Sequence, residues 1–343
     1  MRLTTATLAA LIGALNFLAC GQDAPTPRQQ ALSAVKQYIV ANLAVLDDAA
    51  TKLQAAAPPA DPDGWNSTAD AAAVATMKSE WRRARTYEKV EGAIAVLFPE
   101  FDVSSDQRYD GFLAESGADD NLFDDQNVTG VHAIERILWS DQIPEQVRTF
   151  EQGLPRYRPA AFPATRQEAA DFKDKLCARL VSDIRMVRTQ FSSLDLDDAA
   201  AYRGVVGSMG EQIEKTEKAA TGEEESRYAQ YTLADMRINV EAGMQIFAAF
   251  EPWLKSKMAS SQIDGVMAAF ARLQTAYGRL SGDNLPPVPT TWNSAAPVAA
   301  DLQTPYGMLW NVLHTEADPA SAGSLVSRMD ETAGILGIPE LAP

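Results

Sequence analysis

The chain has 343 residues, of which 46% are hydrophobic and 22% charged, and its formal net charge is −16 at pH 7. This composition is that of a folded protein with a substantial core, and it excludes a mainly disordered chain. The negative charge repels a phosphate backbone, and the only dense basic run is Arg82, Arg83 and Arg85. Nucleic-acid binding is therefore excluded as well.

The first residues have the character of an export signal. Arg2 precedes an apolar stretch from Ala6 to Ala19, which is too short to span a membrane. Because Leu18-Ala19-Cys20-Gly21 resembles a bacterial lipoprotein cleavage site, we expect residues 1–19 to be a signal peptide and residues 20–28 a tether lipidated at Cys20. This predicts a protein of the bacterial periplasm or cell surface that is anchored by lipid, with the outer membrane as the expected location. Plain secretion is the alternative.

The cysteine count limits the chemistry. With Cys20 lipidated, Cys177 has no partner for a disulfide or a cysteine-based metal site. We expect Cys177 to be a small buried residue of a helix. A bound metal would therefore depend on histidine and carboxylates.

Helical periodicity runs through nearly the whole chain, and the alternating pattern of strands is almost absent. Pro- and Gly-rich breaks separate the helices that we expect at residues 29–56, 68–98, 104–115, 128–140, 166–192, 197–219, 224–256, 260–281, 298–316 and 320–336. This pattern predicts an all-α protein made of two packed up-and-down bundles of the four-helix type, at residues 29–192 and 193–343. The boundary is soft, since one continuous bundle could share a single core.

Two carboxylates lie within the apolar face of the second expected helix. The spacing of four and three residues that faces a bundle core is followed by Met77, Trp81, Ala84, Glu88, Glu91, Ala95 and Phe98. Buried carboxylates without a partner are costly, so Glu88 and Glu91 require a cation. On a regular helix, Arg85 and Lys89 would point elsewhere around the axis.

A second pair lies in the segment GVHAIERILW at residues 130–139. On a helix, His132 and Glu135 project together beside the apolar face, because they are three residues apart. Such a pair is a compact two-ligand donor, and Glu88 and Glu91 would complete a set of four. This set suits iron, zinc or manganese better than Cu(I). A hydrogen-bonded His–Glu pair without metal is the alternative.

Several blocks occur in an ordered series between about residues 30 and 281. They are Glu80-Trp81, Tyr87-Glu88-Lys89-Val90-Glu91, Leu97-Phe98-Pro99-Glu100-Phe101-Asp102, Arg108-Tyr109-Asp110-Gly111-Phe112, GVHAIERILW, Thr221-Gly222-Glu223-Glu224-Glu225, Ser226-Arg227-Tyr228 and Asp235-Met236-Arg237-Ile238-Asn239-Val240-Glu241. In this series the chain resembles the imelysin-like family, which includes the EfeO-type proteins of bacterial iron uptake and has the signature GxHxxE. One departure is Ala229-Gln230-Tyr231-Thr232, where the family often has Ser-His-Thr-Asp, so any ligand role of that histidine is lost.

The resemblance implies a helical, periplasm-facing protein with a metal site at GxHxxE, associated with iron acquisition and with a membrane iron-transport component as a partner. It carries His132 and Glu135 over as ligands of iron or zinc, with Glu88 and Glu91 as the facing carboxylates. Further residues are expected to line the cleft or to bond between helices, namely Arg108, Asp110, Trp139, Asp235 and Asn239.

Two other functions stay open. Imelysin-type relatives are classed as metallopeptidases, but HExxH is absent, and the inverted HxxEH would need histidine where Arg136 stands. A polysaccharide- or protein-binding module would use exposed aromatics such as Trp65, Trp253 and Trp292. The other histidine, His314, is expected to be an ordinary surface or core residue.

Overall fold

The computed structural model describes residues 24–341. The expected signal peptide and Cys20 lie outside the described residues. Between residues 24 and 341 the regular structure is helical and contains no strand, which confirms the predicted all-α class. None of the helices in this range combines the length and the apolar character that a membrane span requires.

The helices follow one another along the chain as α1 (Pro27–Ala55), α2 (Ala71–Ala84), α3 (Glu91–Leu97), α4 (Pro99–Asp106), α5 (Tyr109–Glu115), α6 (Gly130–Leu138), α7 (Glu145–Gln152), α8 (Arg166–Asp171), α9 (Ala178–Ser193), α10 (Asp198–Gly210), α11 (Gln212–Lys218), α12 (Thr232–Ser256), α13 (Ser260–Gly278), α14 (Pro305–Glu316) and α15 (Leu325–Leu336). Three turns have another pitch: the 3₁₀ turns η1 (Arg85–Lys89) and η3 (Asp301–Gln303), and the π-helical turn η2 (Phe172–Cys177). The turn η2 joins α8 to α9, and Cys177 is buried there as expected.

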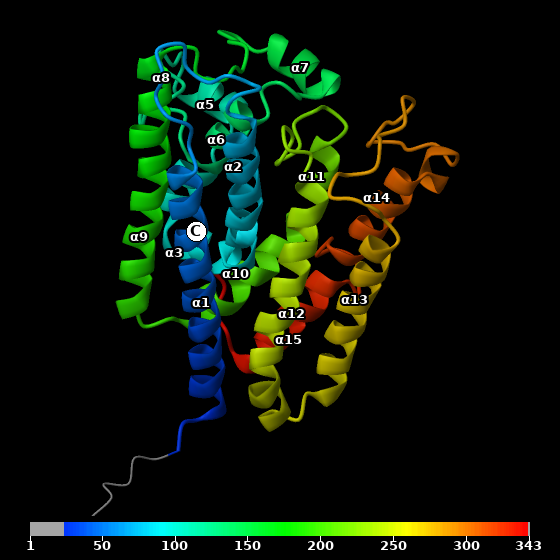
Figure 1. The fold of residues 1–343 in the computed structure, drawn as a ribbon. Helices are drawn as coiled ribbons and strands as arrows, with labels where there is room; N and C mark the ends of the chain where they lie inside the picture. Colours follow the sequence, from blue (N-terminus) through cyan, green and yellow to red (C-terminus); the bar gives the residue numbers. More distant parts are fainter. Residues whose placement is uncertain (1–23, 342–343) are drawn as a thin grey trace, which may run out of the picture.

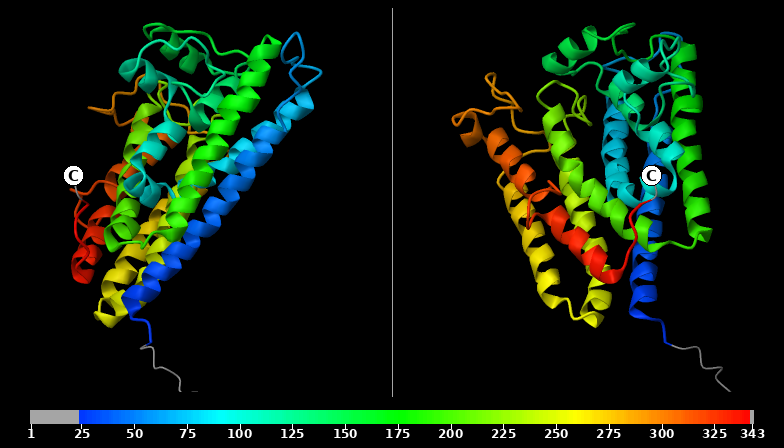
Figure 2. Two further views of the ribbon diagram at one scale, coloured as in Figure 1. Left: turned by 90° about the vertical axis from the view of Figure 1, so that its left-hand side faces the viewer. Right: turned by 180° about the vertical axis from the view of Figure 1, so that it is seen from behind.

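The long helices run side by side along the molecule (Figure 1). Helix α1 packs against α2, α9 and α12, while α13 packs against α12, α14 and α15. The two views of Figure 2 show the short helices α5, α6 and α7 gathered at the end away from the start of α1. One hydrophobic core contains Leu43, Trp81 and Ile134 together with Tyr202, Phe247 and Phe270. Residues of both predicted bundles thus share one core, and their independence stays a prediction.

The two parts of the chain meet most closely where α3 crosses α10. Gly92 and Gly204 face each other there, and a Cβ atom built on Gly204 would lie 1.9 Å from the carbonyl oxygen of Gly92. Only glycine at both positions lets the two backbones approach this far. The crossing fixes the acidic segment around α3 against the second half of the chain.

The single helix predicted at 68–98 is wrong, because it is interrupted. Helix α2 ends at Ala84, η1 follows with the 3₁₀ pattern in which the Val90 N–H donates to the Tyr87 carbonyl oxygen, and α3 begins at Glu91. Helix α3 ends at Leu97, because the following proline disfavours helical geometry at Phe98.

Other predicted helices are also divided or shortened. The helix expected at 104–115 is interrupted by extended backbone at Gln107 and Arg108, and the one expected at 197–219 is split into α10 and α11. Helix α12 begins at Thr232, so residues 224–231 form a turn segment rather than the start of a helix. Helix α7 was not predicted.

Candidate metal centre

The start of α6 is fixed by a close contact between backbones. Gly130 has a φ of 87°, and a Cβ atom there would lie 2.3 Å from the carbonyl oxygen of Ser105. The hydroxyl of Thr129 also donates to the carbonyl oxygen of Ser104 over 2.8 Å. The first turn of α6 therefore lies against the last turn of α4. As a result, His132 lies beside Asp106.

His132 is buried and has one ring nitrogen without a hydrogen bond. Its Nδ1 lies 2.7 Å from Oε2 of Glu135, so a proton on Nδ1 is donated to that carboxylate. Its Nε2 lies 3.1 Å from Oδ1 of Asp106 but is not aligned for a hydrogen bond, and it has no hydrogen-bond partner among the described residues. A buried polar atom in this condition is rare and needs an explanation.

Glu135 is held by hydrogen bonds on both oxygens. Its Oε1 accepts from the backbone N–H groups of Tyr228 and Ala229 over 2.9 and 2.7 Å, and its Oε2 is the partner of His132. The segment before α12 therefore folds over Glu135. A carboxylate in this arrangement fixes the tautomer and orientation of the imidazole.

Arg85 joins four acidic side chains inside the protein. Its guanidinium is fully buried and forms ion pairs with Glu88, with Asp106 over 3.3 Å, with Glu225 over 2.7 Å and with Asp235 over 3.1 Å. The expectation that Arg85 points away from Glu88 is wrong. Side chains three residues apart are neighbours on an α-helix and lie above one another in a 3₁₀ turn, so Arg85 and Glu88 meet directly.

A second buried cation comes from α11. The Nζ of Lys215 lies 3.0 Å from Glu88, 3.7 Å from Glu91 and 2.8 Å from Glu225. Asn239 of α12 donates to the backbone carbonyl oxygen of Glu88 and to Oε2 of Glu91 over 2.9 and 3.1 Å. The two predicted carboxylates are thus buried as expected, and protein cations and an amide occupy them in this structure.

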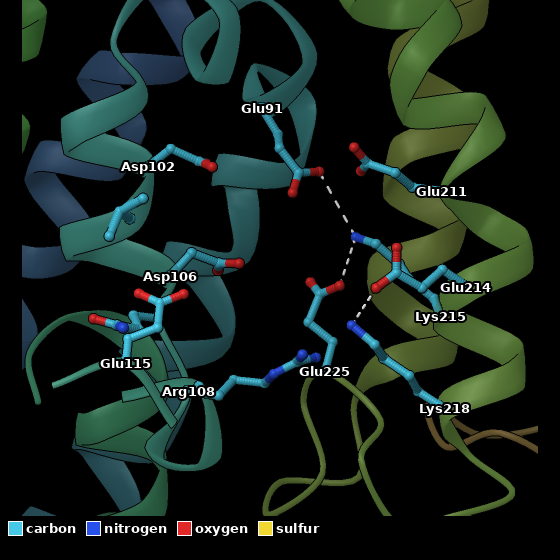
Figure 3. Close-up of a pocket in the computed structure, with 13 residues that line it drawn as sticks. Glu91, Asp102, Asp106, Arg108, Glu115, Glu211, Glu214, Lys215, Lys218 and Glu225 are labelled. Carbon is cyan, nitrogen blue, oxygen red and sulfur yellow. Dashed lines mark ion pairs between the residues drawn. The ribbon is translucent and has the colours of Figure 1, made fainter. Parts of the chain in front are cut away.

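An acidic cleft of about 320 Å³ opens beside these groups (Figure 3). Its wall is formed on one side by α3, α4 and α5 and on the other by α11 and the turn before α12. The charged side chains that line it are Glu91, Asp102, Asp106, Glu115, Glu211, Glu214 and Glu225, with Arg108, Lys215 and Lys218. Carboxylates outnumber cations here, so the cleft attracts positive ions.

The buried carboxylates differ in their tendency to ionise. The pKa of Glu225 stays well below its usual value in spite of burial, because Lys215, Arg85 and His132 surround it. Burial and neighbouring carboxylates instead raise the pKa of Glu88 to about 8 and that of Glu91 well above its usual value. The centre therefore has more carboxylates than its own cations can neutralise.

The pKa of His132 is shifted in the direction opposite to that of an ordinary buried histidine. Burial lowers its pKa, but the carboxylates of Asp106 and Glu135 outweigh that effect and raise the pKa to about 9.

Two groups of ligand atoms converge around His132 and Arg85. Ligand atoms of Asp106, His132 and Glu225 all lie within 4.8 Å of one another, and so do those of Glu88, Glu225 and Asp235.

The other predicted residues have various positions. Arg108 lines the cleft and donates to the backbone carbonyl oxygen of Glu223, whereas Asp110 is ion-paired with buried Arg227. Asp235 and Asn239 belong to the buried network described above. Trp139 packs edge-on against Trp81, with ring centroids 5.1 Å apart, and does not line the acidic cleft.

Sequence reasoning missed Asp106, Lys215 and Glu225. Glu225 lies in the block from Thr221 to Glu225, where the sequence pattern predicts the start of a helix. Asp106 is the last residue of α4, and its approach to His132 depends on the close contact at Gly130. A search for carboxylates next to helix breaks would have included both acidic residues.

The residues on which the two alternative functions depend are mostly buried. Arg136 is buried and forms a two-pronged ion pair with Glu151, over 3.1 to 3.3 Å. Of the aromatics expected to be exposed in a binding module, Trp65 and Trp253 are buried in the core, so the expectation is wrong for these two. Trp292 is half-buried and packs against Tyr306 and Trp310.

The sequence profile of the imelysin family, also classed as peptidase family M75, matches residues 31–304. The iron uptake system component EfeM of Pseudomonas syringae pv. syringae (strain B728a) is 24% identical to the chain over 211 residues. That match spans 61% of this chain and 61% of the length of EfeM.

Proposed function

The chain belongs to the imelysin family, and on this basis we propose that it captures a divalent metal ion for uptake, with iron as the expected cargo. The name of EfeM, an iron uptake system component, supports this cargo. We further propose that capture takes place outside the cytoplasm, with Cys20 as the lipid anchor and a membrane transport component as the recipient of the ion.

The observation that carries the proposal is the ring nitrogen Nε2 of His132. Nε2 is buried, has no aligned hydrogen bond among the described residues, lies 3.1 Å from Oδ1 of Asp106, and belongs to a convergent group with Asp106 and Glu225. Neutral imidazole nitrogen and carboxylate oxygen form a donor set that suits iron, zinc and manganese. In our proposal these three residues bind the ion directly.

Glu135 has a different role in this proposal from the one that its sequence spacing predicts. Its oxygens already bond to His132 and to two backbone N–H groups, so it orients the imidazole and keeps Nε2 available to the ion. Glu88 and Glu91 are proposed to hold Lys215 and Arg85 beside the ion rather than to bind it, since neither belongs to the group of ligand atoms that converges with His132.

The cleft gives the ion a route to the centre. Asp106 and Glu225 line the cleft with their carboxylates, while His132 lies behind them and is fully buried. An entering cation would therefore meet the rim carboxylates first and the histidine last. Because the pKa of His132 is raised, binding releases a proton from it at neutral pH.

The peptidase classification makes a metal-dependent hydrolase the second candidate. Hydrolysis needs an open coordination position and a general base near the attacking water. Glu135, the carboxylate nearest to the His132 ring, is held by three hydrogen bonds and is poorly placed to move a proton. We therefore rank binding above hydrolysis.

Metal content decides the proposal. We expect the chain from Gly21 to bind iron(II), zinc or manganese with loss of binding in the double variant His132→Ala, Glu135→Ala and in Asp106→Asn. His314→Ala is the matched control, because it removes the other histidine and should leave binding unchanged. Elemental analysis measures the number of ions bound per chain, and calorimetric titration measures the affinity, in the wild type and in each variant. Equal stoichiometry in wild type and the double variant would refute the site.

A further inference from the structure

We infer that the guanidinium of Arg85 occupies the position of a second metal ion, so that the centre binds one ion where its carboxylates would otherwise hold two. This inference rests on the proposed function. It starts from the two convergent groups, Asp106–His132–Glu225 and Glu88–Glu225–Asp235, which share Glu225. Two ligand groups joined by one carboxylate have the layout of a two-metal centre.

Arg85 contacts every carboxylate of both groups. Nη2 contacts Glu88 and Glu225, Nε lies 3.1 Å from Asp235, and Nη1 lies 3.3 Å from Asp106. All three carboxylates of the second group therefore converge on one positive charge that is already present. In the first group, by contrast, Nε2 of His132 has no hydrogen-bond partner within residues 24–341.

The position of the guanidinium is fixed by its surroundings. Arg85 is fully buried, and its guanidinium carbon lies 5.8 Å from the centre of the Trp81 ring. It begins the 3₁₀ turn η1, which places it above Glu88. A planar group with several fixed donors matches several carboxylates at once, and Arg stays charged at any working pH.

Lys215 does not fill the same position. It contacts Glu88, Glu91 and Glu225 from the side of the cleft and lines the cleft itself. It has no ion pair with Asp235 or Asp106 among those of the described residues. The chain has two histidines, and His314 lies by Glu217 rather than near Asp235. The second group is thus made of carboxylates alone, and Arg85 neutralises them.

Stoichiometry with Mn²⁺ as the probe tests the inference. We expect one ion per chain in wild type, one in Arg85→Lys, which keeps a cation, and two in Arg85→Ala. Adding Asp235→Asn to Arg85→Ala should return the count to one, while adding His132→Ala should remove the first ion instead. Electron paramagnetic resonance adds an independent readout, because two neighbouring Mn²⁺ ions show exchange coupling and a single ion does not.

The outcomes separate this inference from the proposed function. Two coupled ions in wild type, or one ion in folded Arg85→Ala, would overturn the inference and leave metal binding intact. No ion in wild type would overturn both. If circular dichroism shows that Arg85→Ala does not fold, Arg85→Gln, which keeps a polar side chain without the charge, decides: we expect two coupled ions, and one ion would contradict the inference.

Discussion

Glu135 differs from the other acidic residues of the centre because its partners are a histidine and two backbone N–H groups rather than the buried cations. In Glu135→Gln the single acceptor oxygen can serve His132 or the backbone pair, but not both. We expect metal affinity to fall by about 10- to 100-fold, the usual effect of losing the carboxylate that orients a ligand histidine. Calorimetric titration beside His132→Ala provides the comparison. Binding that disappears as completely as in His132→Ala would make Glu135 a direct ligand.

His132 and Glu88 predict how the metal-free protein responds to pH. The pKa of His132 is raised from 6.5 to about 9, and that of Glu88 from 4.5 to about 8. A group whose pKa is raised by folding stabilises the fold at any pH below its pKa in the unfolded chain. This stability is lost as the pH rises through its pKa in the folded protein. We therefore expect the metal-free protein to lose stability from about pH 4.5, where Glu88 begins to contribute, to about pH 9.

For His132 the expected loss is roughly 1 to 3 kcal/mol. Scanning calorimetry with a chelator present measures it as a falling Tm. His132→Gln should have a smaller slope, since it removes the titrating group but keeps a polar side chain. A Tm that stays level or rises over this range in the wild type would show that the imidazole is not held in its charged form.

The parts of the centre that could be predicted from the sequence are those that depend on spacing within one helix. The all-α class, the helix carrying His132 and Glu135 and the burial of Glu88 follow from apolar spacing, because spacing reports which residues face the core. The contact between Arg85 and Glu88 also follows from a spacing of three residues, but the contacts of Arg85 with Asp106 and Asp235 do not, since they join different elements. Glu225 could not be placed either, because its turn is ordered by tertiary bonds to Glu135.

The crossing of α3 and α10 gives a prediction for a pair of helices. A methyl group on Gly204 would lie 1.9 Å from the Gly92 carbonyl oxygen, whereas one on Gly207 in the same helix would meet nothing within 4 Å. We expect Gly204→Ala to destabilise the protein by about 1 to 3 kcal/mol or more through overpacking. Gly207→Ala should be neutral or stabilising by about 0.5 to 1 kcal/mol.

Urea unfolding of the two variants measures this difference. Both substitutions add the same methyl group to α10, so they change its helix propensity equally. The difference in stability between the two variants therefore reports the packing against α3. If Gly204→Ala were as stable as Gly207→Ala, the two backbones could not lie as close as the structure places them.

At the scale of the whole molecule, the proposed centre joins the two halves of the chain. Asp106 and His132 come from α4 and α6, whereas Glu225 precedes α12. The core is continuous across both halves as well, with Leu43 of α1 and Phe247 of α12 in one cluster. An ion bound to all three ligands would therefore oppose separation of the halves, in addition to the packing that already holds them.

We expect the protein to unfold in one thermal transition, with a midpoint that rises when metal is added. An ion that binds only the folded state contributes about 2.7 kcal/mol when its free concentration is 100 times Kd. Glu225→Gln should remove most of this increase in the midpoint, even though Glu225 and His132 lie in different halves of the chain. Two transitions, of which metal shifts only the one that involves residues 29–192, would instead mean that the halves fold independently and that the ion is held by the first alone.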